Sequence, residues 1–360
     1  MTTAVLDQFR RRFLATTIRK RDVGILSEDQ LAALRTESIK PNDSVLLFRS
    51  NFELLKAVAQ RAGPGSVIFN IDNDPTRVTE LRQQLAATKT LECEATIRCV
   101  CADWSDLRSN LEWSQLKLEE EPVRSVSELV HFREASTSQA RENPVIRDGC
   151  IDVAILPTLN TVPADQIFPL LMEILRVLKN RGRVRLACLI SDEPLSAQAG
   201  RSIPNCYHVP TEMQLMTWLE QTSFYGVEFS RWDQLPWQVI QTVEVRRVEL
   251  NAFKGKEGSC HECHQAVIYC GPWKQVHDDD GHVYKRGERT AVCEKTYRIL
   301  TSKPYKNHFI PLPPCIPVPI ENALQFDCNG SNIRDPGITK GIQPTRSHRV
   351  VNECSSDCEC

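Results

Sequence analysis

The sequence of 360 residues contains no apolar run approaching the ~20 residues needed to cross a bilayer. The segment Met1–Asp22 also lacks the apolar core and small-residue cleavage site of a secretory signal. There is no excess of charge of either sign, because 44 Lys and Arg against 46 Asp and Glu leave a formal net charge of −2. A membrane or a nucleic acid is therefore not expected as a partner. We expect a cytoplasmic protein of about two domains.

Cysteine, in contrast, is abundant, with 15 residues. In a reducing cytosol such thiols more often bind soft metals or exchange electrons than form disulfides. The run Cys260-His-Glu-Cys263-His264 supplies half of a tetrahedral zinc site. A second pair at zinc-ribbon spacing is not obvious, and Cys270 and Cys293 can complete the site only if the fold returns them. The alternative is a surface loop rich in Cys and His without metal.

The arrangement of apolar segments predicts an α/β protein with a doubly wound, Rossmann-like sheet. From residue 43 short apolar runs alternate with amphipathic stretches, in the order strand, helix, strand, helix, strand. Residues 108–148 form a charged insertion that is either helical or partly disordered. We expect a helical segment at 1–42, this α/β domain at 43–225, a smaller α+β domain at 226–310, and a flexible tail with Pro and Cys at 311–360.

Two carboxylates follow neighbouring strands of the predicted sheet. Asp72 ends the second strand, where a carboxylate can accept both hydroxyl protons of a ribose. Asp103 follows the third strand beside Trp104, where the carboxylate can meet an adenine amino group and the indole can cover the base. The alternative for Asp72 is an ordinary turn, because Asp74 and Pro75 make a good helix start.

The segment 176–182, Arg-Val-Leu-Lys-Asn-Arg-Gly, resembles the end of the last helix in class I S-adenosylmethionine (SAM)-dependent methyltransferases, which commonly reads Arg-Val-Leu-Lys-Pro-Gly-Gly. The resemblance covers about residues 43–192 and implies SAM as cofactor. Such enzymes place a glycine-rich turn after the first strand so that backbone can approach the cofactor. Here Arg49, Ser50 and Asn51 occupy that cofactor loop, and none is glycine. The loop therefore predicts that SAM binds weakly or not at all.

The stretch 260–309 resembles the carboxy-terminal domain of arsenite methyltransferases. The matching features are Cys260, the run Gln265-Ala-Val-Ile-Tyr269, Val292-Cys293 and Asn307-His308-Phe309. This resemblance implies methyl transfer from SAM to trivalent arsenic, supplied as arsenite or methylarsenite and held by thiolates.

Of the cysteines that hold arsenic in that family, one has a counterpart here, Cys206 in Pro204-Asn-Cys-Tyr207. The resemblance implies that Cys206 is a catalytic residue and a metal ligand. Cys260 and Cys263 are the other predicted ligands, for zinc or trivalent arsenic. Where the family has a further thiol, this chain has Thr158. Two functions follow: an arsenite-type methyltransferase, or a catalytically degenerate relative that binds soft metal or an unknown protein partner through its cysteines.

Overall fold

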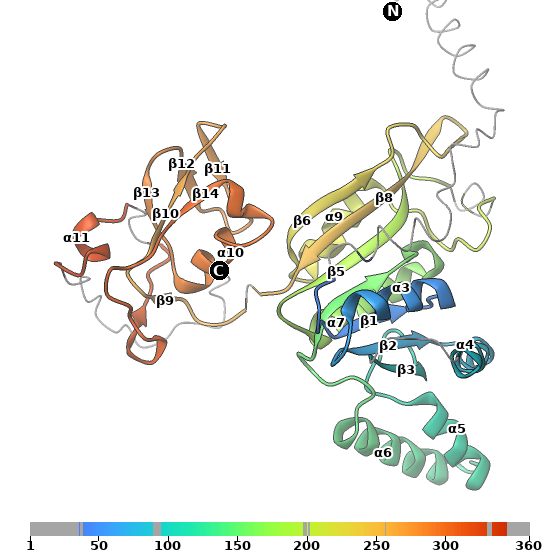
Figure 1. Cartoon of the computed structure of the whole chain (residues 1–360). Coiled ribbons are helices and arrows are strands. Elements are labelled where there is room, and N and C mark those ends of the chain that lie inside the picture. The colour runs from blue at the N-terminus through green and yellow to red at the C-terminus, as the bar shows by residue number, and fades with distance from the viewer. Residues whose placement is uncertain are drawn as a thin grey trace, which may run out of the picture. The chain divides into compact units, whose positions relative to one another are not determined.

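The computed structural model describes residues 36, 39–88, 95–196, 200, 202–255, 257–329 and 333–343. The chain divides into two compact units, Met1–Lys254 and Gly255–Cys360 (Figure 1). No helix among the described residues combines the length and apolarity of a membrane span. The predicted helical segment at 1–42 lies almost wholly outside the described residues, and so does the end of the chain from residue 344.

The first unit is built on one sheet with the strand order β3-β2-β1-β4-β5-β8-β6, and β7 pairs with β8. The strands from β3 to β5 run parallel to their neighbours, whereas β8 is antiparallel to β5, β6 and β7. The order reverses between β1 and β4, which is the position where doubly wound sheets bind ligands. The strands are β1 (Val45–Phe48), β2 (Val67–Asp72), β3 (Thr96–Cys101), β4 (Ile151–Leu156), β5 (Leu178–Ser191), β6 (Tyr225–Trp232), β7 (Gln238–Ile240) and β8 (Val243–Phe253).

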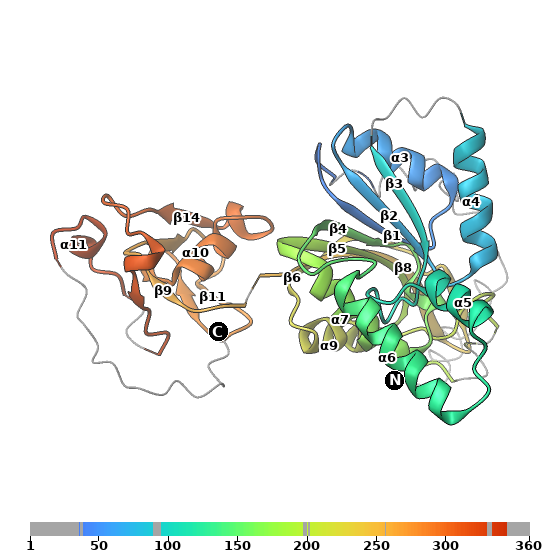
Figure 2. The same ribbon diagram turned by 90° about the horizontal axis from the view of Figure 1, so that it is seen from below.

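Helices cover both faces of this sheet because its central strands are apolar on both sides. In β1, Val45 and Leu47 join the apolar cluster under α3 (Phe52–Ala62) and α4 (Pro75–Ala87). Leu46 and Phe48 alternate with them and join the cluster under α7 (Ala164–Val177) and α9 (Glu212–Gln221). Figure 2 shows α3 and α4 on one side of the sheet and α7 and α9 on the other. The predicted doubly wound fold is confirmed.

The insertion at 108–148 is helical, as one of the two expectations had it. It forms α5 (Leu111–Glu120) and α6 (Val126–Glu142), neither of which contains a buried residue. A capping box between Ser125 and Glu128 begins α6.

The second unit contains three small sheets around its own apolar cluster. One sheet has the order β13-β10-β14, and the other two are the pairs β11-β12 and β15-β9. The elements are β9 (His261–Glu262), β10 (Ala266–Tyr269), β11 (Gln275–His277), β12 (Val283–Lys285), β13 (Arg289–Ala291), α10 (Glu294–Leu300), β14 (Phe309–Leu312), β15 (Leu324–Gln325) and α11 (Pro336–Thr339).

Two predicted boundaries are wrong. Residues 226–254 belong to the first unit, because β8 pairs with β5 from Arg183↔Phe253 to Ser191↔Val245. The proline-rich segment after 311 was expected to be a flexible tail, yet β14 pairs with β10 and places Pro311 opposite Val267. Proline is accommodated there because β14 is an edge strand of its sheet.

Candidate functional site

The loop after β1 is held by side chains at the position where the fold family uses glycine. Ser50 is buried, and both its backbone N–H and its hydroxyl donate to Asn70 Oδ1, at 3.2 and 2.6 Å. Asn51 caps α3 by accepting from the backbone N–H of Leu54 at 2.9 Å. Arg49 has φ +48°, in the left-handed region that favours glycine. The three predicted cofactor-loop residues thus fasten β1 to β2 and begin α3.

Asp72 stands at the end of β2, as predicted, but it is enclosed. The residue is 2% exposed. Its Oδ1 accepts from the backbone N–H of Asp74 at 3.1 Å, and its Oδ2 accepts from Arg77 Nε at 2.9 Å in an ion pair. Asp74 in turn caps α4, with Pro75 in the first turn. The predicted helix start at Asp74 and Pro75 is therefore present. The Asp72 carboxylate is also present, and it binds groups of the chain itself, the Asp74 N–H and Arg77.

Asp103 and Trp104 follow β3 but point to different surroundings. Asp103 is exposed, and its Oδ1 accepts from the backbone N–H and the hydroxyl of Ser105, both at 2.8 Å. Trp104 is 5% exposed and packs edge-on against Phe48, with ring centroids 6.3 Å apart. It belongs to the apolar cluster under α7 and α9. The indole is therefore a core side chain, and not the open platform that was predicted for a base.

These residues do not fit SAM as the fold family holds it. Asp72, which was predicted to bind the ribose, is paired with Arg77, the loop after β1 carries side chains, and the Trp104 indole is packed on Phe48. A nucleoside would have to displace the Arg77 side chain, which is 41% exposed, from the buried Asp72 carboxylate.

Cys206 lies in a satellite cluster of the first unit, packed against Ile203, Val209 and Val245. Its Sγ contacts the carbonyl oxygen of His208 at 3.5 Å. Burial raises the pKa of the Cys206 thiol, which disfavours the thiolate, and no second thiol acts on it in the part of the chain that the structure describes. Its roles as catalytic residue and as arsenic ligand remain predictions.

The loop after β4, which contains Thr158, is held by hydrogen bonds of Asn160. The Asn160 amide nitrogen donates to the carbonyl oxygens of Leu189 and His208, both at 2.9 Å, and its Oδ1 accepts from the N–H of Leu189 at 2.6 Å. Thr158 is exposed at the start of this loop. Asn160 thus fixes the segment that carries Cys206 to the end of β5.

In the second unit Cys260 and Cys263 flank β9, and two further thiols, Cys293 and Cys328, are close enough to Cys260 for side-chain hydrogen bonding to shift its pKa. Burial raises the pKa of the Cys263 thiol. No three of these four sulfurs lie within 4.8 Å of one another. Cys270, the other expected partner, is instead exposed, with its Sγ 3.0 Å from the carbonyl oxygen of His308. Cys328 was missed because it lies in the segment taken for a tail.

A second group of ligand-type side chains forms a turn between β11 and β12. Donor atoms of Asp278, Asp280 and His282 lie within 4.8 Å of one another. Asp278 Oδ2 pairs with His282 Nδ1 at 2.9 Å and accepts from the Tyr284 hydroxyl at 2.8 Å. The hydrogen bond that the His282 ring donates to the Asp278 carboxylate raises the pKa of His282. This network organises the hairpin through Asp278.

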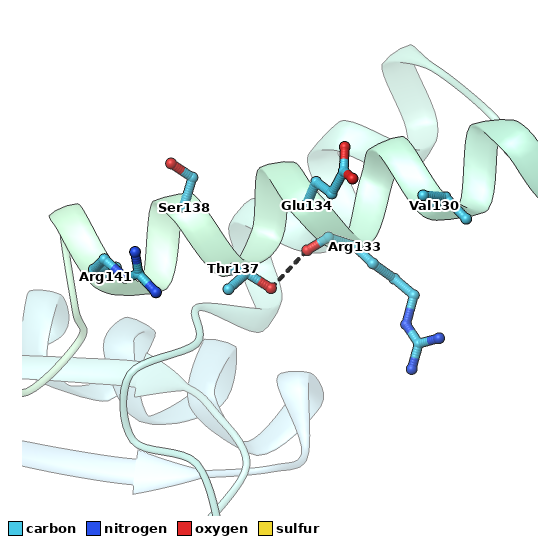
Figure 3. A pocket seen from close by; sticks show the side chains of 6 residues that line it. All are labelled: Val130, Arg133, Glu134, Thr137, Ser138 and Arg141. Atoms are coloured by element: carbon cyan, nitrogen blue, oxygen red, sulfur yellow. Dashed lines mark hydrogen bonds between the residues drawn. The ribbon is translucent and has the colours of Figure 1, made fainter.

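One face of α6 borders a hollow of about 490 Å³ (Figure 3). All six lining residues come from this helix, and Thr137 donates to the carbonyl oxygen of Arg133 at 2.8 Å. None of the predicted site residues takes part. The lining residues are Val130, Arg133, Glu134, Thr137, Ser138 and Arg141.

Comparison with known proteins gives one family model and several solved structures. Residues 256–344 match a family described as "Domain of unknown function (DUF8838)". The matched range contains residues 260–309. No curated protein matches the chain. An arsenic (III) S-adenosylmethionine methyltransferase from Chlamydomonas reinhardtii is similar at 14% identity and a TM-score of 0.41, over 80% of this chain and 89% of that one.

Two further methyltransferases are similar at the same level. A SAM-dependent methyltransferase from Aquifex aeolicus has 11% identity and a TM-score of 0.39, over 64% of this chain and 92% of its own. A putative sarcosine dimethylglycine methyltransferase from Galdieria sulphuraria has 9% identity and a TM-score of 0.41, over 64% and 86%. The Rossmann-like architecture of the first unit is assigned from the strand order of its sheet and not from these similarities.

Proposed function

We propose that the first unit is a methyltransferase-fold scaffold that does not use SAM as a methyl donor. The observation that carries this proposal is Asp72, whose two buried carboxylate oxygens each already accept a hydrogen bond, one from a backbone N–H and one from Arg77. A carboxylate that serves a ribose needs free acceptor positions facing the ligand. Here the Asp72 side chain is 4% exposed, so a nucleoside would first have to displace Arg77.

The loop after β1 supports the same proposal. The Ser50–Asn70 pair is buried, and Arg49 adds a long side chain where backbone alone would face a ligand. Breaking the Ser50 bond would leave Asn70 Oδ1 without this donor in the interior, at a cost of about 1–3 kcal/mol. The closed state of this edge is thus favoured by two separate groups of contacts.

The second candidate is methyl transfer from SAM to a small molecule, with trivalent arsenic as the acceptor that Cys206 would hold. Its support is the sheet itself. Parallel strands end at one edge, and Asp72 lies opposite Cys101, two residues before Asp103. If Arg77 moved away, these two carboxylates would border the same edge of the sheet as the switch point between β1 and β4.

Calorimetric titration with S-adenosylhomocysteine distinguishes the two candidates. The intact chain is expected to show no binding in the micromolar range. The double variant Arg49→Gly/Arg77→Ala is expected to gain affinity by at least about tenfold, a difference of about 1.4 kcal/mol, because it frees Asp72 and opens the loop. Arg133→Ala, on the exposed face of α6, is the matched arginine control and is expected to leave binding unchanged.

A micromolar dissociation constant in the unaltered chain, about −8 kcal/mol at 1 μM, would contradict the scaffold proposal. If Asp72→Ala then abolished that binding, the methyltransferase candidate would stand. Unchanged binding in Cys206→Ser, tested with a trivalent arsenical, would remove arsenic from that candidate.

A further inference from the structure

We propose that Cys260, Cys263, Cys293 and Cys328 form a four-thiolate zinc site in the second unit. The proposal concerns this unit alone and does not depend on the function proposed for the first. It extends the predicted Cys260–Cys263 half-site by naming the two cysteines that complete it.

The pairing of β15 with β9 brings Cys328 back to Cys260. These short strands are antiparallel, with Gln325 opposite His261. The pairing continues one residue further, because the backbone N–H of Phe326 donates to the carbonyl oxygen of Cys260 at 2.9 Å. Two residues later the chain reaches Cys328, whose side chain is close enough to that of Cys260 for hydrogen bonding to shift the pKa of the Cys260 thiol.

A second pairing brings Cys293 to the other end of the same turn. β10 and β13 are antiparallel with Ala266 opposite Ala291, so the residues just before Ala266 and just after Ala291 lie side by side. Gln265 strengthens this junction by donating from its side chain to the carbonyl oxygen of Val292 at 3.2 Å. Cys293 follows directly, and Cys263 precedes Gln265 by two residues.

Two of the four cysteines, Cys263 and Cys293, are buried, and all four are free thiols. Hydrogen bonding with the Cys260 side chain raises the pKa of the Cys293 thiol, which places these two side chains close together. No three of the four sulfurs lie within 4.8 Å of one another as the structure describes them. Zinc binding would therefore turn the four side chains toward one ion to complete a tetrahedral set.

Neighbouring groups can support thiolate charge and hold the turn in place. The backbone N–H of Thr296 donates to Cys293 Sγ at 3.4 Å, and the Thr296 hydroxyl lies 3.2 Å from it. Glu262, between the two cysteines of the turn, is held by Arg334 Nη2 at 2.8 and 2.9 Å. Such partners outside the ligand set orient metal ligands.

The ligand chemistry selects the ion. Four cysteine sulfurs in a closed, partly buried set are typical of structural zinc. Binding would release the thiol protons as the metal bonds form, so occupancy would rise with pH. The alternative ion for four thiolates is iron in an iron–sulfur cluster, which the experiment must exclude.

Metal analysis of the intact chain, purified under reducing conditions without chelator, tests the site. About one zinc per chain is expected, falling at least about tenfold in Cys263→Ser and in Cys293→Ser. Cys270→Ser is the matched control in the same unit, because Cys270 is exposed and bonded to a backbone carbonyl. The triple variant Cys354→Ser/Cys358→Ser/Cys360→Ser is expected to keep its zinc.

Because a ligand variant can lose metal simply by unfolding, a second measurement uses the unaltered chain. Cobalt(II) added after removal of zinc is expected to give the visible absorption of tetrahedral cobalt with thiolate charge-transfer bands. An octahedral spectrum, absence of any metal after incubation with zinc, or iron with labile sulfide in place of zinc would each overturn the proposal. Loss of zinc in the triple tail variant with retention in Cys293→Ser would overturn it as well.

Discussion

Glu249→Ala is expected to lower the free energy of unfolding of the first unit by about 3–5 kcal/mol. Glu249 Oε2 accepts from Arg185 Nη2 at 3.0 Å across the paired strands β5 and β8, and the two side chains are only 9% and 7% exposed for Arg185 and Glu249 respectively. Arg185 Nε already has no hydrogen-bond partner. Removing the carboxylate would therefore leave an unpaired guanidinium inside the sheet. Urea unfolding of the intact chain, followed through the first unit's transition, measures this loss.

The matched experiment removes both charges. Arg185→Met/Glu249→Leu is expected to recover most of the stability, because two apolar side chains leave no buried charge unpaired. Glu134→Ala, in the exposed pair with His131 on α6, is expected to leave the transition unchanged. A loss well under about 1 kcal/mol in Glu249→Ala would mean that water reaches Arg185 and that the interior of the sheet is wrongly described.

Arg334→Ala is expected to have an effect of similar size on the second unit, about 3–5 kcal/mol. The Arg334 side chain is 4% exposed, donates from Nε to the carbonyl oxygen of Gln265 at 3.1 Å, and pairs with Glu262. Its loss would leave the Glu262 carboxylate, 11% exposed, without that partner. Unfolding of the second unit, monitored by hydrogen exchange of β10 in the intact chain, measures the change.

Arg334→Lys separates charge from shape in the same experiment. Lysine keeps the positive charge but cannot reproduce the planar guanidinium that reaches Gln265 and Glu262 together, so we expect it to recover only part of the loss. If Arg334→Ala left the exchange of β10 unaltered, the segment that contains Arg334 would not be docked on β9 as described.

The strand pattern of the first unit could be read from the sequence because it is local. Alternating apolar residues such as Leu46 and Phe48 show a strand buried on both faces without any knowledge of its partners. The pairing of β8 with β5 could not be read in this way. It joins segments that are distant in sequence, and β8 carries Glu249 and Arg246 among its apolar residues. The expected boundary at 226 was wrong for that reason.

For the candidate site, the sequence indicated where the two aspartates lie along the chain but not which side chains contact them. Asp72 and Asp103 stand after β2 and β3 as expected, since a carboxylate after an apolar run is visible in the sequence. The ion pair between Arg77 and Asp72 could not be predicted, because it depends on the direction of the Arg77 side chain at the start of α4. An arginine five residues after the strand-ending aspartate was the available signal. The burial of Trp104 depends on Phe48, from another strand, and had no local signal.

The four cysteines of the second unit also show that long-range pairing is hard to predict from sequence. Cys260 and Cys263 are recognisable from their spacing, whereas Cys293 and Cys328 reach them through strand pairings that no spacing rule records. The prolines near residue 311 suggested an unpaired tail, because a strand interior excludes proline. An edge strand accommodates proline, so the segment that leads to Cys328 could be ordered despite its prolines, and nothing in the sequence indicated this.

Thermal unfolding of the intact chain with and without 1 mM S-adenosylhomocysteine tests the central claim most directly. A ligand at about 100 times its dissociation constant stabilises the folded state by about 2.7 kcal/mol, so a 10 μM site would raise the melting temperature of the first unit by several degrees. The closed edge around Asp72 and Arg77 predicts no shift in the unaltered chain and a rise in Arg49→Gly/Arg77→Ala. A rise in the unaltered chain that Asp72→Ala removes would contradict it.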